Sequence, residues 1–594
     1  MDRSAATSSP ERTKDLALYA IAAGAVVVGI LWLAGAAAAR LAGHPVPRHR
    51  PLGELAAFGD FANPSAGWGA PVGPPVLYWA VTFTILAVLV VAGCLGWRLL
   101  RRAHRWEEDD PTRVEGLADR HHIVTAAGPK ILLARAPILR PSLSHPRPVD
   151  VGYCLGTSRG VGCWASVEDS IVVLGPPRSG KGYHLVIPSI LDAPGAVITT
   201  GTRADNLTTT ITARAKVGPV AVFDPQGLAA GVPSTLRWSP VRGCQRPQTA
   251  MIRAHALCAD TGAGTENGNF WRQQTITAVR CLLHAAALGE RPPADLYRWS
   301  LSAPAAKDAV DILLRSGDTA APAWEKALDA IISAEARQRD SIWAMVANAF
   351  ACLGDPQVLA AVTPREGEVF DPAGFLRAKG TLFLLGTATG ASATASLVAA
   401  LVEDVVDVAR RMAGASAGAR LDPPLGLILD EAANYPLPSL GSLMSEGGGS
   451  GITTIAVLQS LAQARDKWGT EMGQAIWDAA IAKVILGGGS NADDLADISR
   501  LIGERSVRDY TETSQAGGGK SISESNRDRA ILDPAALRAI GPGHGLLLLR
   551  SARPIMLTLR PWTARADAAR LGNERAGVET SLRSAAQDDW GNVA

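Results

Sequence analysis

Hydrophobic residues are distributed along this chain in three distinct patterns, and the first lies near the amino terminus. Two long runs without a charged residue cover positions 16–39 and 75–97. Each run reaches the roughly 20 apolar residues that a helix needs to cross a ~30 Å hydrocarbon layer. The sequence therefore predicts a membrane anchor over residues 1–105, containing two transmembrane helices at about 16–39 and 75–97.

The charges beside these runs predict the orientation of the anchor. Basic residues precede the first run and follow the second, whereas the loop between them carries a balanced set of charges. Lys and Arg are enriched in cytoplasmic flanks. We therefore expect a multi-pass protein of the plasma membrane with both termini and the body of the chain in the cytoplasm.

The second pattern consists of short apolar runs that recur between residues 151 and 562. Examples are Ile171–Leu174, 220–223, 425–430 and 452–458, each followed by polar residues and separated from the next by helical stretches. Buried parallel strands read as such continuous apolar runs, and their carboxyl ends gather functional side chains. The predicted fold class is α/β with a parallel sheet.

The third pattern interrupts the second. Between residues 243 and 372 the strand-like runs give way to amphipathic segments such as 271–287, which predicts an inserted all-α domain. The sheet domain would then comprise residues 151–242 and 373–562. Residues 106–150 are charged and proline-rich and are expected to form a stalk, 511–525 a flexible loop, and 563–594 a mobile tail.

A glycine-rich segment directly follows the strand predicted at 171–174. It reads Gly175, Pro176, Pro177, Arg178, Ser179, Gly180, Lys181 and Gly182. Two glycines four residues apart with a lysine after the second have the spacing of a phosphate-binding loop, in which backbone N–H groups surround phosphate oxygens and the lysine contacts the β- and γ-phosphates. The alternative is a glycine-rich turn that ends an ordinary strand.

Gly182 departs from the usual pattern of this loop. Ser or Thr normally follows the lysine and binds Mg²⁺ through its hydroxyl. The metal would here be held through waters from a distant carboxylate or by Ser179, or the site would bind nucleotide weakly.

Three further residues are candidates for the chemistry of an ATPase. Asp430 and Glu431 close an apolar strand, where the first would hold the Mg²⁺ shell and the second would orient or deprotonate the attacking water. Gln459 follows the next strand, where a polar side chain could sense the γ-phosphate. The alternatives are a surface turn for the acidic pair and a hydrogen-bonded core residue for Gln459.

Composition adds little to this picture. The formal net charge of +2 gives no general argument for nucleic-acid binding. The seven cysteines form no C-x-x-C pair, and the ten histidines form no metal-binding spacing, so the sequence suggests neither a disulfide framework nor a zinc site.

Taken in order, these features resemble the type IV coupling proteins of the TraG/TraD kind, the membrane-anchored ATPases of conjugative DNA transfer. The resemblance is carried by the two apolar runs, the loop 175–182, Phe223-Asp-Pro225, the helical insertion, Leu429-Asp-Glu431 and Val457-Leu-Gln-Ser-Leu461. It covers roughly residues 10 to 560. Glycine after the lysine also occurs in that family.

The resemblance implies a RecA-like P-loop NTPase core that assembles as a homo-hexamer around a channel in the inner membrane. Lys181, Glu431 and Gln459 would be catalytic, Asp430 would bind the metal, and ATP and Mg²⁺ would be the cofactors. The partners implied are DNA, as a single strand with its bound relaxase, and the components of the secretion channel. The all-α domain would receive that strand.

Two other functions remain open. An FtsK-like double-stranded DNA translocase would share the anchor and motor, although such proteins usually append a winged-helix reader, for which the short polar tail leaves no room. A cargo receptor that does not hydrolyse nucleotide is the other, suggested by Gly182 and by the lack of an arginine in the turn 446–451.

Overall fold

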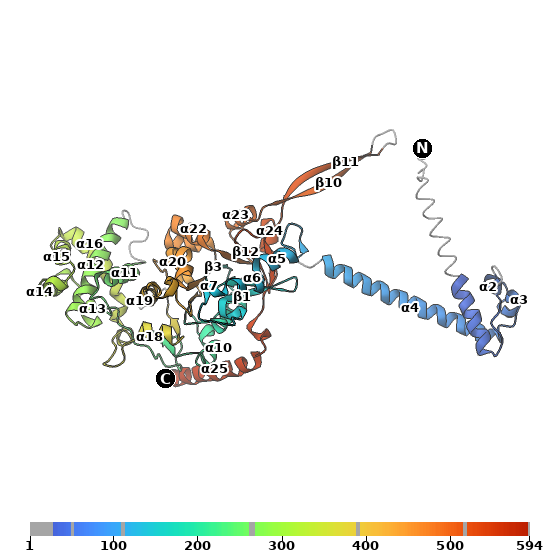
Figure 1. Cartoon of the computed structure of the whole chain (residues 1–594), viewed down its shortest axis with the longest axis horizontal. Coiled ribbons are helices and arrows are strands. Elements are labelled where there is room, and N and C mark those ends of the chain that lie inside the picture. Colours follow the sequence, from blue (N-terminus) through green and yellow to red (C-terminus); the bar gives the residue numbers. More distant parts are fainter. Residues whose placement is uncertain are drawn as a thin grey trace. The chain divides into compact units, whose positions relative to one another are not determined.

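The structure is a computed structural model, and it describes residues 28–48, 53–108, 113–259, 268–387, 393–514 and 520–591 (Figure 1). The chain divides into two compact units, Met1–Asp110 and Pro111–Ala594. Each unit has its own apolar core.

The first unit is helical. An apolar helix at Val28–Leu41 is followed by α2 (Gly53–Ala56), α3 (Pro64–Trp68) and α4 (Pro75–Glu108). Within the described residues, one segment is long and apolar enough to cross a membrane, Pro75–Arg98 of α4. The first predicted span, 16–39, lies partly outside the described residues, and its described part belongs to the shorter helix.

The second unit is built on an eleven-stranded sheet with the order β2-β1-β13-β12-β9-β3-β8-β7-β4-β6-β5. Strands β3 to β9 are mutually parallel, and the other four pair antiparallel at one end. The bounds are β1 (Gly152–Ser158), β2 (Val161–Ser166), β3 (Ile171–Leu174), β4 (Val197–Gly201), β5 (Val220–Phe223), β6 (Thr381–Leu385), β7 (Leu425–Leu429), β8 (Ile452–Leu458), β9 (Ala482–Leu486), β12 (His544–Leu549) and β13 (Ile555–Thr558). The α/β class predicted from the sequence is confirmed.

Helices cover both faces of this sheet, so its parallel strands are buried on both sides. Along β3, Ile171 and Val173 belong to one apolar core, and Val172 and Leu174 belong to the other. Successive side chains of a strand point to opposite faces, which is why this strand is apolar throughout. The helices are α9 (Ile187–Asp192), α10 (Asp205–Arg214), α18 (Pro372–Arg377), α19 (Ala395–Gly414), α20 (Leu440–Glu446), α21 (Leu461–Trp468), α22 (Thr470–Ala479), α23 (Ala492–Ile502) and α24 (Pro534–Arg538).

Between β5 and α18 the described elements are all helical. They are α11 (Pro247–Leu257), α12 (Gly268–Leu288), α13 (Pro293–Ser300), α14 (Lys307–Arg315), α15 (Trp324–Ile332), α16 (Ala336–Phe350) and α17 (Pro356–Ala361), together with short 3₁₀ turns. Figure 1 shows these helices gathered to one side of the sheet. Their first helix, α11, packs against α19 of the sheet domain.

A buried cluster around Asp404 of α19 joins this helical segment to the sheet domain. The Asp404 carboxylate accepts a hydrogen bond from Trp238 Nε1 at 2.9 Å and pairs with Arg242 at 3.0 Å and Arg253 at 2.8 Å. Arg253 and Asp404 are almost fully buried, and the Arg253 guanidinium lies 4.7 Å from the centre of the Trp238 ring. The anion therefore balances buried positive charge.

Replacing Asp404 with alanine is expected to lower the free energy of unfolding by about 3 kcal/mol, because it leaves a buried guanidinium without its counter-ion. Urea denaturation of the full chain in detergent, followed by tryptophan fluorescence, measures this. Asp407→Ala, which breaks a more exposed pair with Arg411 on the same helix, should cost less than about 1 kcal/mol. An equal decrease in the free energy of unfolding of the two variants would contradict the role given to Asp404.

Three regions differ from the sequence-based expectation. The stretch expected to be a stalk, 106–150, contains α5 (Arg120–Ala127), α6 (Pro129–Ala134), α7 (Ala136–Leu139) and α8 (Pro148–Val151), and its apolar side chains join the core of the sheet domain. The expected loop at 511–525 lies largely in a hairpin of β10 (Glu504–Ser514) and β11 (Lys520–Ala530), paired in register. Residues 515–519 of that stretch lie outside the described residues.

The carboxyl-terminal segment expected to be a mobile tail forms a helix instead. Helix α25 spans Ala568–Gly591 and packs against α10, with Leu571 fully buried. The prediction failed because this segment is polar overall, and a small number of apolar residues is sufficient to hold one helix face against another. Figure 1 shows α25 lying along α10.

Candidate functional site

The segment 175–182 leaves β3 at the carboxyl edge of the sheet and leads into a π-helical turn, Gly182–Val186, and then α9. A Cβ at Gly175 would lie 2.7 Å from Ser179 Oγ and 2.9 Å from Leu486 Cδ1, so a larger residue there would force these side chains to shift. Arg178 and Gly180 have left-handed backbone angles, with φ of 66° and 84°. These angles give the loop a tight curvature, which suits wrapping around an anion.

Lys181 lies at the end of this loop and its side chain folds back over it. Its Nζ donates a hydrogen bond to the Gly175 carbonyl at 3.4 Å. The charge of Lys181 also acts on Asp430, because it lowers the pKa of that carboxyl against a larger opposing effect of burial. The structure thus brings Lys181 and Asp430, about 250 positions apart in the chain, to one electrostatic site.

The strand order explains how these residues meet. β8 lies between β3 and β7, with Leu174 paired to Leu458 and Leu429 paired to Ala456. The loop after β3, the residues after β8 and the acidic pair after β7 therefore emerge side by side at one edge. Parallel sheets bind their ligands at this edge.

Asp430 is held with one carboxylate oxygen engaged and the other without a partner. Its Oδ2 accepts a hydrogen bond from Asn206 Nδ2 at 3.1 Å, and Thr200 Oγ1 donates to its backbone carbonyl at 2.8 Å. Its Oδ1 is buried and has no hydrogen-bond partner. Burial raises the pKa of this carboxyl, and the hydrogen bond from Asn206 and the charge of Lys181 offset part of that effect.

Glu431 is oriented by two neighbours. Its Oε2 accepts hydrogen bonds from Thr202 Oγ1 at 2.6 Å and from Asn434 Nδ2 at 3.0 Å. Its backbone is left-handed, with φ of 52°, a conformation that costs a non-glycine residue about 1–2 kcal/mol. Strain of this kind is concentrated at functional sites because the surrounding contacts must maintain it.

Gln459 follows β8 and therefore lies between the loop and the acidic pair. Its backbone N–H donates to Gln463 Oε1 at 3.2 Å. Gln459 and Ser460 line a cavity of about 170 Å³ together with Gly175, Pro176 and Pro177 of the loop. The structure thus places Gln459 next to the loop.

The oxygen atoms of Asp430 and Ser179 suit a magnesium ion that is bound together with a phosphate. The described residues contain no group of three or more His, Cys, Asp or Glu side chains that could hold a metal alone. Mg²⁺ usually takes one or two carboxylates and completes its shell with waters and substrate phosphates. The free Oδ1 of Asp430 and the buried, unpartnered Oγ of Ser179 fit such a shell.

Sequence reasoning missed several residues of this site. Thr202 and Asn206 follow β4, and Asn434 lies in the turn after the acidic pair. A signal was present, since the apolar run of β4 ends in polar residues like those of its neighbours. Arg465, on α21 after Gln459, pairs with the buried Asp494 at 2.5 Å.

Replacing Asp430 with asparagine is expected to stabilise the nucleotide-free protein by about 1 kcal/mol at pH 8. The folded state holds the Asp430 proton more tightly than the unfolded state, because burial raises this pKa. The contribution of Asp430 to the free energy of unfolding of the wild type therefore falls as pH rises from about 4 through the raised pKa. The gain from Asp430→Asn should be largest above that pKa and vanish near pH 4. Thermal denaturation of both proteins across this range measures the difference, and a less stable variant at pH 8 would contradict it.

Comparison with known proteins gives a family match over part of the chain. Residues 424–542 match a family model described as the TraM recognition site of TraD and TraG. No curated protein matches the sequence. The matched segment contains β7, the acidic pair and β8, so it agrees with the TraG/TraD resemblance that the motifs indicate.

Several solved structures are similar to this chain. The unbound bacterial conjugative coupling protein TrwB has 17% identity and a TM-score of 0.49, covering 68% of this chain and 88% of that one. TrwB in complex with ADP and Mg²⁺ has 16% identity and a TM-score of 0.48, covering 71% and 91%. VirB4 of Thermoanaerobacter pseudethanolicus has 12% identity and a TM-score of 0.40, covering 69% and 96%.

Proposed function

We propose that this TraG/TraD-like chain is a membrane-anchored ATPase that couples ATP hydrolysis to the transfer of DNA through a type IV secretion channel. Its family is indicated by the match over residues 424–542. The observation that carries the activity is the meeting of Lys181, Asp430 and Glu431 at one sheet edge, beside a loop shaped for phosphate.

Each of the residues at this edge has a separate role in phosphoryl transfer. Residues 175–182 bind the phosphates through backbone N–H groups, and Lys181 neutralises charge on the β- and γ-phosphates. Asp430, through its free Oδ1, would hold Mg²⁺, which when bound neutralises charge on the phosphate oxygens. Glu431, fixed by Thr202 and Asn434, orients and deprotonates the attacking water. Gln459 would contact the γ-phosphate and respond to its loss.

The domain organisation supports a motor of this kind. Residues 151–242 and 373–562 would form a RecA-like core, 243–372 an all-α domain that receives DNA, and 1–105 the anchor. Helix α4 offers one described segment able to span the inner membrane. We infer assembly as a homo-hexamer, with relaxase-bound single-stranded DNA and secretion-channel components as partners.

Hydrolysis that responds to DNA tests this proposal. Phosphate release by the full chain in detergent is measured at saturating Mg²⁺ and ATP without DNA, with single-stranded DNA and with double-stranded DNA. We expect single-stranded DNA to raise the rate at least about fivefold, the lower end of usual coupling between sites. A rate that neither form of DNA changes would contradict the proposal, and a larger response to double-stranded DNA would favour an FtsK-like translocase.

A receptor that binds cargo without hydrolysis is the second candidate, because Gly182 supplies no hydroxyl for the metal. The structure offers a direct test at this position, since a Cβ at Gly182 would meet no atom within 4 Å. A side chain therefore fits there without rearrangement.

For a motor, Gly182→Ser is expected to lower the Mg²⁺ concentration that gives half-maximal hydrolysis by about threefold to tenfold, since its hydroxyl can bind the ion directly. Gly182→Ala is the matched control, because it adds the Cβ without the hydroxyl. We expect Gly182→Ala to behave as the wild type. If neither the wild type nor Gly182→Ser hydrolyses ATP, the receptor is favoured.

A further inference from the structure

The π-helical turn that follows the phosphate loop carries an aromatic side chain, Tyr183, two residues after Lys181. Tyr183 has 41% of its surface exposed. In a loop of this type the lysine contacts the β- and γ-phosphates, and backbone N–H groups hold the α- and β-phosphates. The sugar and base of a nucleotide bound there would therefore lie beyond the loop, on the side of its α-phosphate.

A second segment, distant in the sequence, reaches the same edge of the sheet. β13 pairs antiparallel with β12, β12 pairs antiparallel with β9, and β9 runs parallel to β3. β13 thus runs in the same direction as β3, and the residues that follow each of these strands leave the sheet at its carboxyl edge. Trp562 and Thr563, in the 3₁₀ turn Trp562–Ala564 after β13, therefore come close to the end of the phosphate loop.

Tyr183 is held by this second segment. Its hydroxyl forms a hydrogen bond with Thr563 Oγ1. The centre of its ring lies 6.2 Å from that of Trp562, with 76° between the ring planes, and 5.0 Å from that of His184, with 81° between the planes. Both contacts are edge-to-face, and among the described residues no ring lies stacked in parallel on Tyr183. A ring that is held in place and partly exposed can stack with a further planar group.

The second segment is itself anchored to the helix that follows the loop. Trp562 is buried and shares an apolar core with Ile187 of α9 and Leu571 of α25. Arg565 pairs with Asp192, the last residue of α9, at 2.7 Å. The residues that contact the exposed ring are thus fixed by packing and by an ion pair. This fixation reduces the conformational freedom that the ring would lose when a ligand binds.

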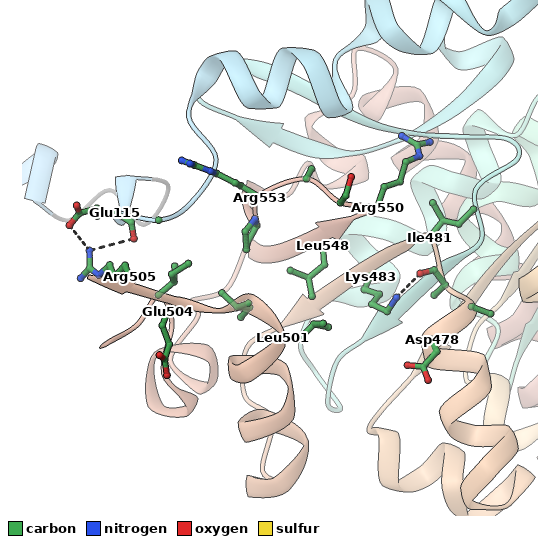
Figure 2. A pocket seen from close by; sticks show the side chains of 18 of the residues that line it. Glu115, Asp478, Ile481, Lys483, Leu501, Glu504, Arg505, Leu548, Arg550 and Arg553 are labelled. Carbon is green, nitrogen blue, oxygen red and sulfur yellow. Dashed lines mark hydrogen bonds and ion pairs between the residues drawn. The ribbon is translucent and has the colours of Figure 1, made fainter. Parts of the chain in front are cut away.

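A cavity of about 860 Å³ in the same unit lies at the opposite edge of the sheet. Figure 2 shows it between the turn after β12, the end of α23 and the start of β10. Its lining includes residues at the start of β9, where Ala482 pairs with Ile171, the first residue of β3. The loop 175–182 follows the other end of β3. A base joined to phosphates in that loop would therefore lie near Tyr183 and not in this cavity.

We propose that the Tyr183 ring stacks with the base of the nucleotide bound by the loop 175–182, and that Thr563 holds the ring for this contact. This inference rests on the ATP site proposed above. Tyr183 would contribute to nucleotide affinity through the base, whereas Lys181 and Asp430 would contribute through the phosphates and the metal. Stacking acts on the face of a base and not on the polar groups at its edge, so Tyr183 would favour a nucleotide over a bare phosphate chain without selecting adenine over guanine.

The test is calorimetric titration of the full chain in detergent and Mg²⁺ with two ligands, a non-hydrolysable ATP analogue and inorganic tripolyphosphate. Tyr183→Leu keeps an apolar side chain but removes the ring, and we expect it to weaken binding of the ATP analogue about tenfold, as for the loss of one stacked base. Its affinity for tripolyphosphate, which has no base, should match that of the wild type. Tyr183→Phe keeps the ring and should weaken binding of the ATP analogue less. Phe270→Leu, which removes an exposed ring from α12, is the matched control and should change neither affinity.

Equal affinity of the wild type and Tyr183→Leu for the ATP analogue would overturn this inference and leave the proposed ATP site intact. An equal loss of affinity for the ATP analogue and for tripolyphosphate would also overturn it, because Tyr183 would then shape the loop. No binding of either ligand by the wild type would overturn the ATP site as well. If thermal denaturation shows that Tyr183→Leu is unfolded, Thr563→Val, at an exposed position outside the loop, replaces it and should weaken binding of the ATP analogue alone. Unchanged binding by Thr563→Val would then overturn the inference.

Discussion

Replacing Lys181 with alanine is expected to lower the rate of ATP hydrolysis at least about 100-fold, the usual effect of removing one group that stabilises a developing charge. The Lys181 ammonium donates to the Gly175 carbonyl of the loop 175–182, and its charge lowers the pKa of Asp430 against the larger effect of burial. Without it, charge that develops on the β- and γ-phosphates has no fixed counter-charge from this loop. Steady-state phosphate release by the full chain at saturating Mg²⁺ and ATP measures the change.

Lys467→Ala is the matched control for Lys181→Ala. Lys467 lies on α21 near the same edge of the sheet but is exposed to solvent. Its replacement should leave the rate within about twofold of the wild type, as expected for a solvated surface charge. If Lys181→Ala also hydrolysed ATP within about twofold of the wild-type rate, Lys181 would have no part in the chemistry.

Replacing Glu431 with glutamine is expected to lower hydrolysis by about 1,000-fold while nucleotide affinity changes little. Glutamine keeps the size of the side chain and can still meet Thr202, but it cannot take a proton from water, a contribution worth about 10²–10⁴ in rate. Single-turnover hydrolysis and the binding of a fluorescent ATP analogue measure the two quantities separately.

Asp430→Asn should give a different pattern from Glu431→Gln. This substitution removes the carboxylate assigned to the metal, so the Mg²⁺-dependent part of nucleotide affinity should fall together with the rate of hydrolysis. The assignment of the two acids would be reversed if Glu431→Gln lost Mg²⁺-dependent binding and Asp430→Asn retained it.

The parallel strands could be predicted from the sequence because both of their faces are buried. The run Ile171–Leu174 has the same bounds as β3, and the apolar segments at 220–223 and 452–458 coincide with β5 and β8. A strand that packs on both sides is apolar at most of its positions, so the sequence shows it as a nearly continuous apolar run. The polar residue that ends each run then locates the candidate site.

Elements with mixed composition could not be predicted in this way. The strands β10 and β11 consist mainly of charged and polar residues, so the sequence gives no apolar pattern that would mark them as strands. The partners of Asp430 and Glu431 were also hidden. Asn206 and Thr202 lie more than 220 positions away from the acids, and the order of the strands, which no local pattern encodes, brings them together.

The position of a bound nucleotide tests the account most directly. A cryo-electron microscopy structure of the full chain with a non-hydrolysable ATP analogue and Mg²⁺ should show the phosphates against residues 175–182, Lys181 on the β- and γ-phosphates, and the ion beside Asp430. Phosphates bound elsewhere, with that loop empty, would contradict the claim that these residues form one ATP site.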